Sequence, residues 1–482
     1  MLFNSWTFAA FLLVVLPVYY ALPRRGQNLF LLAASYVFYG WWDWRFLSLL
    51  WISTVVDYAV ALALDATDDA RKRRLLILMS LIVNLGMLGF FKYFNFFVES
   101  AIDTLQSIGL EASTPLLHVV LPVGISFYTF QTLSYTLDVY RKEQPACKSL
   151  VDFALFVSYF PQLVAGPIER ATALLPQIQS DRRVSQQDWT SGTQLILWGF
   201  VKKVAIADSL AQYVDTAFSD PSAGDSLTLL LCTYAFALQI YCDFSGYSDI
   251  ARGISRILGI ELMENFKQPY LARNITEFWR RWHISLSTWL RDYLYIPLGG
   301  NRFGTRAQYR NLFITMLLGG LWHGANWTFV LWGAMHGTML AVHKYLLRGR
   351  RVAVEGVPVS ASAWLRYCAG VIVTFNLVCF TWIFFRAATL DEAITYISQI
   401  AGGTLPAGAS LYEPAYFGLV EALTFYGIVL FVLDGRCWFR NAELPYSERD
   451  VWWRSGIAYA AGMLILLLVR ENASGAFIYF QF

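Results

Sequence analysis

Two of the five histidines of this chain lie in sequence contexts that suit proton transfer. His323 lies in the apolar stretch LGGLWHGA, where the flanking glycines let a ligand approach the backbone closely and leave room beside the imidazole. A histidine suits general-base chemistry because its ordinary pKa lies near neutrality and burial keeps the ring neutral. A packing histidine between two membrane helices is the alternative interpretation, and the glycines favour the base only slightly.

His283 lies beside two arginines, Arg280 and Arg281, in the sequence RRWHIS. Arginines at such a place suit an anion, for example a phosphate or a carboxylate. The alternative is an interfacial histidine between arginines whose charged ends reach the membrane surface. His336 follows His323 by 13 residues, about 220° round a continuous helix, so the two are not expected to share a face.

Two aspartates, Asp243 and Asp249, interrupt the apolar stretch at residues 226–258. Arg252 follows Asp249 by about one helical turn, so an ion pair within the helix is the favoured interpretation, since buried charges are usually paired. Charged groups inside a membrane span also suit a transporter that moves an acyl donor or a lipid without chemistry. The sequence contains no internal repeat of the kind that many transporters have.

Motifs of several other enzyme classes are absent from the sequence. It contains no GxxxxGK phosphate-binding loop, no GxSxG nucleophile elbow and no HExxH zinc motif. No histidine is followed five residues later by an aspartate, so the His-x4-Asp pattern of other acyltransferases is missing as well. The six cysteines show no metal-binding spacing, and we expect no bound metal.

The composition is that of a membrane protein. Hydrophobic residues make up 57% of the chain and charged residues 15%, against roughly 25% in a typical soluble domain. The mean hydropathy is +0.45, so most of the surface must face lipid or other membrane helices. The net charge of +3, without a basic run that contains aromatic residues, gives no indication of nucleic-acid binding. We therefore expect an all-α, polytopic membrane protein.

Apolar stretches that approach the roughly 20 residues needed for one crossing recur along the whole chain. Some are short and some long, so we expect roughly ten to twelve crossings with re-entrant segments between them. No linker or low-complexity tract separates them, which favours a single domain over residues 1–482. The stretches cover residues 6–22, 28–42, 46–64, 74–96, 116–139, 150–166, 188–218, 226–258, 310–346, 364–386, 413–433 and 455–470.

Basic residues in the short loops predict the orientation, because cytoplasmic loops carry an excess of lysine and arginine. Arg24 and Arg25 place the first loop inside, and the basic residues at 65–74 place a later loop inside as well. Residues 97–117 contain neither lysine nor arginine, and we expect them outside. The N-terminus is therefore expected outside, and residues 6–22 are expected to form a retained helix rather than a cleaved signal peptide.

The arginine-rich, aromatic stretch at residues 259–309 is too polar to span the membrane freely. Asn274 followed by Glu277 predicts the start of a helix there. This helix would end at Pro297, and an amphipathic helix of this kind lies at an interface or dips into the protein. Its apolar stripe consists of Phe278, Trp282, Leu286, Trp289 and Tyr293.

Four blocks of the sequence resemble the membrane-bound O-acyltransferases, in the branch that contains the alginate O-acetyltransferases and the D-alanine transfer proteins. The blocks are Phe3–Ser5, Tyr159–Ile168, parts of Asn265–Tyr293, and Leu321–Gly324; the last two are specific in combination. The resemblance spans nearly the whole chain, with little signal towards the C-terminus. It implies a ring of helices around a central tunnel, with a catalytic core at about residues 120–345.

The resemblance also implies roles for individual residues. His323 is expected to be the catalytic base, since moving an acyl group from a thioester to a hydroxyl requires deprotonation of that hydroxyl. His283 is expected to be catalytic beside the same tunnel, where a neutral His283, Asn265 or a tryptophan N–H would orient the acyl carbonyl group. Arg280 and Arg281 would hold the diphosphate of a coenzyme A donor, and interfacial snorkelling is at least as good an interpretation of both. The expected substrate-binding residues are Trp322, Asn265, Arg280, Arg281, Trp282 and Ser287.

We therefore expect a multi-pass enzyme of a bacterial inner membrane that passes an acetyl group from a cytoplasmic thioester, acetyl-CoA, to an exported polysaccharide, alginate. No cofactor is expected to stay bound. The resemblance implies periplasmic acetyltransferase partner proteins, and the apolar end Phe477–Phe482 would dock one of them or lie on the membrane. The alternatives are a transporter or scaffold without chemistry, and an O-acyltransferase for cellulose, peptidoglycan or teichoic acid.

Overall fold

The computed structural model describes residues 1–110, 117, 120–347, 358, 360–403 and 414–445. Within these residues the regular elements are helices and no strand occurs, so the expected all-α polytopic membrane fold is confirmed. The chain divides into two compact units, Met1–Ile196 with Ile250–Met263 and Leu197–Asp249 with Glu264–Phe482. The expected span at 455–470 and the segment Phe477–Phe482 lie outside the described residues.

Five helical segments among the described residues are long and apolar enough to cross a membrane. The chain is therefore an integral membrane protein. The larger number of crossings expected from the sequence stays a prediction, because several apolar stretches are divided into shorter helices. The five segments are Arg24–Asp65, Ala70–Ser107, Ser226–Ile257, Ala361–Arg386 and Tyr416–Arg440, and Trp6–Ala21 is a shorter apolar helix.

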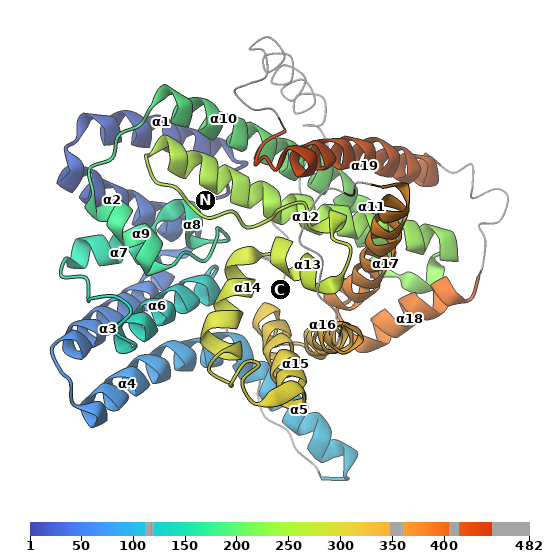
Figure 1. The fold of residues 1–482 in the computed structure, drawn as a ribbon, viewed down its shortest axis with the longest axis horizontal. Helices are drawn as coiled ribbons and strands as arrows, with labels where there is room; N and C mark the ends of the chain where they lie inside the picture. The colour runs from blue at the N-terminus through green and yellow to red at the C-terminus, as the bar shows by residue number, and fades with distance from the viewer. Residues whose placement is uncertain (111–116, 118–119, 348–357, 359, 404–413, 446–482) are drawn as a thin grey trace. The chain divides into compact units, whose positions relative to one another are not determined.

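The first unit contains the helices of the N-terminal part of the chain (Figure 1). Capping side chains fix several of their starts: Ser5 accepts the N–H of Phe8, and Asp69 accepts that of Arg71. The helices are α1 (Trp6–Ala21), α2 (Arg24–Asp43), α3 (Leu47–Asp65), α4 (Ala70–Leu88), α5 (Phe94–Ser107), α6 (Ile125–Tyr140), α7 (Leu150–Ser158), α8 (Phe160–Leu163), α9 (Ala171–Gln179) and most of α10 (Gln186–Phe200), with the short turns η1 (Trp44–Phe46) and η2 (Gly89–Tyr93).

A polar cluster around Asp57 ties three of these helices together. Asp57 lies on α3 with none of its surface exposed, and its carboxylate accepts hydrogen bonds from Ser80 and, at 2.9 Å, from Asn84, both on α4. The hydroxyl of Ser53 donates to the amide oxygen of Asn84 and lies 3.2 Å from the hydroxyl of Thr132 on α6. Inside a membrane such a carboxylate is tolerated only where donors satisfy it, so this cluster fixes the register of the three helices.

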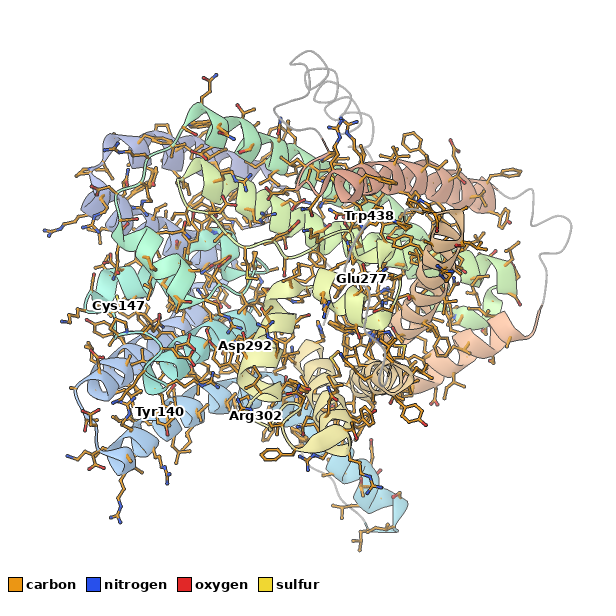
Figure 2. All side chains as sticks on the ribbon, in the orientation of Figure 1. Tyr140, Cys147, Glu277, Asp292, Arg302 and Trp438 are labelled. Atoms are coloured by element: carbon orange, nitrogen blue, oxygen red, sulfur yellow. The ribbon has the colours of Figure 1, made fainter. Side chains whose placement is uncertain are left out.

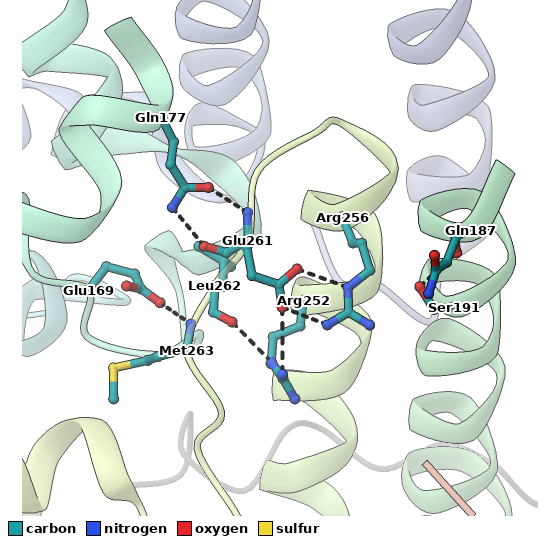
Figure 3. A network of polar contacts seen from close by, with 9 residues as sticks. All are labelled: Glu169, Gln177, Gln187, Ser191, Arg252, Arg256, Glu261, Leu262 and Met263. Atoms are coloured by element: carbon teal, nitrogen blue, oxygen red, sulfur yellow. Dashed lines mark hydrogen bonds and ion pairs between the residues drawn. The ribbon is translucent and has the colours of Figure 1, made fainter. Parts of the chain in front are cut away.

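The loop that follows α12 is held in the first unit by side chains that bond its backbone (Figure 3). The amide of Gln177 donates to the carbonyl of Glu261 at 3.0 Å and accepts its N–H at 2.8 Å, as a neighbouring strand would. The buried carboxylate of Glu169 accepts the N–H of Met263, and Arg252 donates to the carbonyl of Leu262 at 3.3 Å. Burial raises the pKa of Glu169 to about 7.

The second unit contains the remaining described helices, and α12 begins in it and ends in the first unit. The elements are the π-helix η3 (Val201–Ala207), α11 (Asp208–Ser219), η4 (Pro221–Ala223), α12 (Ser226–Ile257), η5 (Pro269–Leu271), α13 (Ile275–Arg281), α14 (Ile284–Leu290), η6 (Arg291–Tyr295), α15 (Gly304–His323), α16 (Trp327–Leu346), α17 (Ala361–Arg386), α18 (Leu390–Ala401) and α19 (Pro414–Arg440). Trp438 on α19, labelled in Figure 2, packs on Tyr367 of α17 with ring centroids 5.2 Å apart.

The apolar stretch at 310–346 forms two helices, α15 and α16, which lie side by side (Figure 1). The chain leaves the helix at Gly324, and Asn326 starts the next one by accepting the N–H of Thr328 at 3.0 Å. Small residues let the two backbones meet: a Cβ at Gly320 would lie 2.9 Å from the Cα of Gly333. The two helices therefore form a tightly packed hairpin.

Candidate active site

The segment that contains His283 is broken where one continuous amphipathic helix was expected. Asn274 caps α13 as predicted, accepting the N–H of Glu277 at 2.9 Å, but α13 ends at Arg281. His283 has φ +44° and ψ +56°, and α14 begins at the next residue. The predicted single helix to Pro297 is therefore wrong, because a residue in the left-handed region cannot continue a right-handed helix.

Asn265 holds this break in place from a neighbouring loop. Its backbone carbonyl accepts the N–H of Ile284 at 2.9 Å, and its side-chain oxygen accepts the backbone N–H of Ser285 at 3.2 Å. The amide nitrogen of Asn265 donates to the hydroxyl of Ser248 at 3.3 Å. Since a backbone N–H can only donate, the side-chain atom of Asn265 that faces Ser285 must be the oxygen. The orientation of the amide is therefore settled by its contacts.

The same contacts determine the state of His283. Its Nδ1 atom lies 3.2 Å from the Asn265 oxygen, which can only accept, so Nδ1 carries the proton and Nε2 is a hydrogen-bond acceptor. The ring has no exposed surface and packs edge-on against Phe244, with centroids 4.7 Å apart. Burial lowers the pKa of His283 to about 3, so the ring is neutral and only weakly basic.

His323 is the last residue of α15 and its side chain is buried. Its imidazole lies 6.3 Å from that of His283, measured between ring centroids. Trp332 of α16 and Phe385 of α17 pack edge-on against it, with centroids 5.1 and 5.3 Å away. Trp322 lies 5.1 Å from the His323 ring and 6.1 Å from the His283 ring. The structure thus brings together both predicted histidines and two predicted substrate-binding residues, Trp322 and Asn265.

His336 lies next to this cluster, on the second helix of the hairpin. The prediction that His336 and His323 do not share a face assumed a continuous helix, whereas the two lie on separate helices of the hairpin. The ring of Trp332 contacts both, with centroids 5.1 Å from His323 and 4.7 Å from His336. Gly324 and Asn326 were the signals for the turn that changes the geometry.

Trp282 and Ser287 contribute to the wall of the cluster. Trp282 is buried, stacks on Phe278 with centroids 5.5 Å apart and contacts Trp382 at 5.0 Å. The hydroxyl of Ser287 donates to the backbone carbonyl of Trp282 at 3.1 Å. Both residues therefore stabilise the break at His283 in addition to any contact with substrate.

The two arginines that precede the break have different surroundings. Arg281 is buried and forms an ion pair with Glu277 at 2.8 Å, and it also donates to the carbonyl of Lys267. Arg273 pairs with the same carboxylate at 3.2 Å; Glu277 is labelled in Figure 2. Arg280 is exposed. Of the two, Arg280 is therefore the better placed for a soluble anion.

A buried charge cluster in the second unit contains residues that sequence reasoning missed. Lys202 and Lys203 are neighbours on the π-helix η3, and both are buried. Lys203 lies 2.6 Å from Asp243 and 2.8 Å from Asp208, and Lys202 pairs with Asp249. Both aspartates are therefore ion-paired with lysines of η3, and the pair of Asp249 with Arg252 within α12 stays a prediction. Two adjacent lysines in the apolar stretch at 188–218 were the available signal.

Comparisons with known proteins identify the family of the chain. The sequence profile of the membrane-bound O-acyltransferase family matches residues 36–385. A protein of Azotobacter vinelandii named "Probable alginate O-acetylase AlgI" is 47% identical over 400 residues, covering 82% of this chain and 76% of the relative. A protein of the same name from Pseudomonas putida is 46% identical over 100% of both chains, and the peptidoglycan O-acetyltransferase of Helicobacter pylori is 34% identical over 100% of this chain and 98% of its own. The chain that places these buried histidines side by side therefore belongs to the membrane-bound O-acyltransferase family and is an O-acyltransferase.

Proposed function

We propose that this enzyme O-acetylates an exported polysaccharide, and that the polysaccharide is alginate. The similarity to alginate O-acetylases over most or all of the chain supports the reaction and the acceptor. The observation that carries the chemistry is the pair of buried imidazoles, His283 and His323, whose centroids lie 6.3 Å apart inside an aromatic wall. Exclusion of water from such a site strengthens each hydrogen bond made to the reacting groups.

His323 acts as the general base in this proposal. The acceptor hydroxyl gives its proton to the His323 imidazole as its oxygen attacks the acyl carbonyl carbon. His283 is unsuited to that role, because burial lowers its pKa to about 3 and a ring of such low basicity removes a proton poorly. His283 instead accepts a hydrogen bond at Nε2, since Asn265 fixes the proton on Nδ1; the donor is a neighbouring hydroxyl of the acceptor sugar, and this contact orients the sugar.

The donor in the proposal is a cytoplasmic thioester, acetyl-CoA. Arg280 is the arginine that would contact its diphosphate, because Arg280 is exposed whereas Arg281 is engaged with Glu277. The acetyl group passes through the tunnel implied by the family resemblance to the periplasmic side of a bacterial inner membrane, where the N-terminus also lies. Periplasmic acetyltransferase partners receive it or complete its transfer to the polymer.

A second acceptor is favoured by one observation. The peptidoglycan O-acetyltransferase of Helicobacter pylori is similar to this chain over its whole length, at 34% identity against 46–47% for the alginate O-acetylases. Peptidoglycan is therefore the alternative polymer, with the same base and the same donor.

The test replaces His323 by alanine in an alginate-producing bacterium that lacks its own alginate O-acetylase. Ester-linked acetate per uronic acid in the exported polymer is measured, together with the amount of the variant in the membrane. We expect acetylation to disappear at normal protein levels. His343→Ala is the matched control. His343 also lies on α16, but it is not part of the histidine cluster, and its Nδ1 atom lies 2.8 Å from the hydroxyl of Thr276.

Acetylation that persists in the His323→Ala strain would show that His323 is not the base. If wild-type protein leaves alginate without acetate but adds acetate to the muramic acid of peptidoglycan in the same cells, the acceptor is peptidoglycan.

A further inference from the structure

Two side chains on one face of α16 have polar atoms that find no partner in the described part of the chain. Thr328 and Trp332 are one helical turn apart, and they are 0% and 1% exposed. The hydroxyl of Thr328 and the indole N–H of Trp332 meet no hydrogen-bond partner among the residues that the structure describes. Leaving a buried donor unsatisfied destabilises a fold, and buried polar groups nearly always have a partner, so two such donors on one helix face need an explanation.

The position of Thr328 explains why its hydroxyl has no partner in its own helix. A threonine inside a helix usually donates to the carbonyl four residues earlier, as Thr315 does to Asn311 at 2.7 Å in α15. For Thr328 that residue is Gly324, which lies before α16 begins. Because α16 begins only one residue before Thr328, the buried hydroxyl has no carbonyl of its own helix to bond.

The ring of Trp332 is held rigidly beside the proposed base. It stands nearly perpendicular to the His323 imidazole, at 87° with centroids 5.1 Å apart. Trp382 stacks on it from one side at 5.8 Å, and Phe385 contacts it at 5.3 Å. A donor that is fixed before the substrate arrives costs little reorganisation during the reaction, which is the requirement for stabilising a developing negative charge.

His336 packs on this ring, with centroids 4.7 Å apart, and is itself held by a directed chain of hydrogen bonds. The indole N–H of Trp279 donates to Nδ1 of His336 at 3.2 Å, so the proton of His336 lies on Nε2. This Nε2–H donates to Thr381 at 3.0 Å, and Thr381 donates to the carbonyl of Val378 at 2.7 Å. Residues of α13, α16 and α17 are thereby locked around Trp332.

Two of the other donors first considered for the acyl carbonyl, His283 and Asn265, are already engaged. The Nδ1 proton of His283 faces Asn265, and its Nε2 is an acceptor, so this ring offers no second N–H to a carbonyl oxygen. The amide nitrogen of Asn265 donates to Ser248. An indole N–H was also among the expected donors, and that of Trp332 is buried beside the base with no partner among the described residues.

We propose that the indole N–H of Trp332, with the hydroxyl of Thr328 as a second donor, binds the carbonyl oxygen of the acyl group while it is transferred at His323. This inference rests on the proposed function. The acceptor hydroxyl forms the new C–O bond and its proton moves to His323. The carbonyl electron pair moves to oxygen, where Trp332 and Thr328 stabilise the negative charge. When the carbonyl re-forms, the C–S bond breaks and the thiolate takes the proton from His323.

The test removes each donor, and two of its three variants keep the shape of the side chain. At position 332, tryptophan is replaced by 3-benzothienylalanine, in which sulfur stands where the indole has N–H; Trp332→Phe is the second variant. At position 328 the change is Thr328→Val. Polymer acetylation is measured at an induction level where it is proportional to the amount of wild-type protein, with the membrane level and melting temperature of each variant.

Loss of one donor to a developing oxyanion typically slows the reaction by about 100-fold or more, so we expect a loss of that size at position 332. We expect about a tenfold loss for Thr328→Val, because a hydroxyl can rotate and is less well directed. Thr315→Val is the matched control, since it removes a buried helical hydroxyl that has its own partner. The control should change acetylation less than twofold.

Acetylation within twofold of wild type in the benzothienylalanine protein would overturn the assignment to Trp332. If that occurs while His323→Ala is inactive, only this inference fails and the proposed base stands. If His323→Ala remains active, the proposed function fails first. A Trp332→Phe protein that is unstable while the benzothienylalanine protein is stable and active would assign Trp332 to packing alone.

Discussion

The imidazole of His323, at the end of α15, and that of His283, at the break between α13 and α14, have ring centroids 6.3 Å apart. The backbone positions the two residues in different ways. His323 is carried by a regular helix that ends at the next residue, whereas His283 is directed by a left-handed backbone conformation. The effect of the left-handed backbone at His283 can be tested separately from the effect of its side chain.

Replacing His283 by glycine or by alanine should separate backbone strain from chemistry. Glycine adopts φ +44° without steric cost, whereas alanine there costs about 1 kcal/mol. We expect both proteins to lose acetylation, and we expect His283→Gly to unfold at the higher temperature. Thermal unfolding in one detergent, with polymer acetate from the same strains, checks this; equal melting temperatures would show that the conformation carries no strain.

Replacing His336 by leucine should destabilise the fold and the site together. The change leaves the N–H of Trp279 without its partner and removes the donor to Thr381, whose hydroxyl keeps its bond to Val378, so the cost is about 1–3 kcal/mol. His336→Gln keeps a side chain that can both accept and donate, and should retain more of the wild-type stability and acetylation. A glutamine variant no better than the leucine variant would contradict the directed chain of hydrogen bonds.

Replacing Gly320 by alanine should force the α15–α16 hairpin apart. The new Cβ would lie 2.9 Å from the Cα of Gly333 and closer still to the carbonyl of Phe329, and neither is a flexible side-chain end. We expect a loss of stability of several kcal/mol and loss of acetylation. Gly435→Ala on α19 is the control, because a Cβ added there would meet nothing within 4 Å among the described residues; it should be neutral or stabilising.

Glu169 should make the stability of the first unit depend on pH. Burial raises its pKa to about 7 in the folded protein from 4.5 in the unfolded chain, with Arg252, Arg170 and Glu261 as the charged groups nearby. The protonated form is thus favoured by folding, so this contribution to stability is complete below about pH 4.5 and is lost as the pH rises through about 7. Melting temperature should fall between pH 5.5 and 8 in wild type.

Glu169→Gln is the comparison for this pH dependence. Its amide oxygen still accepts the N–H of Met263, and it does not ionise. The fall in melting temperature over the same pH range should be smaller in this variant, and an identical fall would assign the effect to other groups.

Much of the site could be predicted from local sequence. The cap at Asn274 was readable because a capping residue and its partner lie within four positions. The glycines around His323 and the resemblance to known acyltransferases identified the residue that lies in the buried cluster. These features depend on neighbours in the chain or on a resemblance that includes them.

The break at His283 could not be predicted from the apolar stripe that contains Phe278, Trp282 and Leu286. The spacing of Phe278, Trp282 and Leu286 is correct for a helix, yet Asn265, from a separate loop, bonds the backbone of Ile284 and Ser285 and ends α13 early. Likewise, the partners of Asp243 and Asp249 lie on a π-helix whose inward lysines no helical wheel would place. Contacts between distant segments decided these points.

The contact between Gly320 and Gly333 limits how this enzyme can open. Because the two backbones meet with no side chain between them, α15 cannot slide or tilt without carrying α16 along. We therefore expect His323 and Trp332 to move together, so that fluctuations of the protein change their mutual distance and angle little. Entry and exit of reactants must then depend on displacement of other parts of the chain, such as α17 or the loop that carries Asn265, while the base and the indole beside it stay in register.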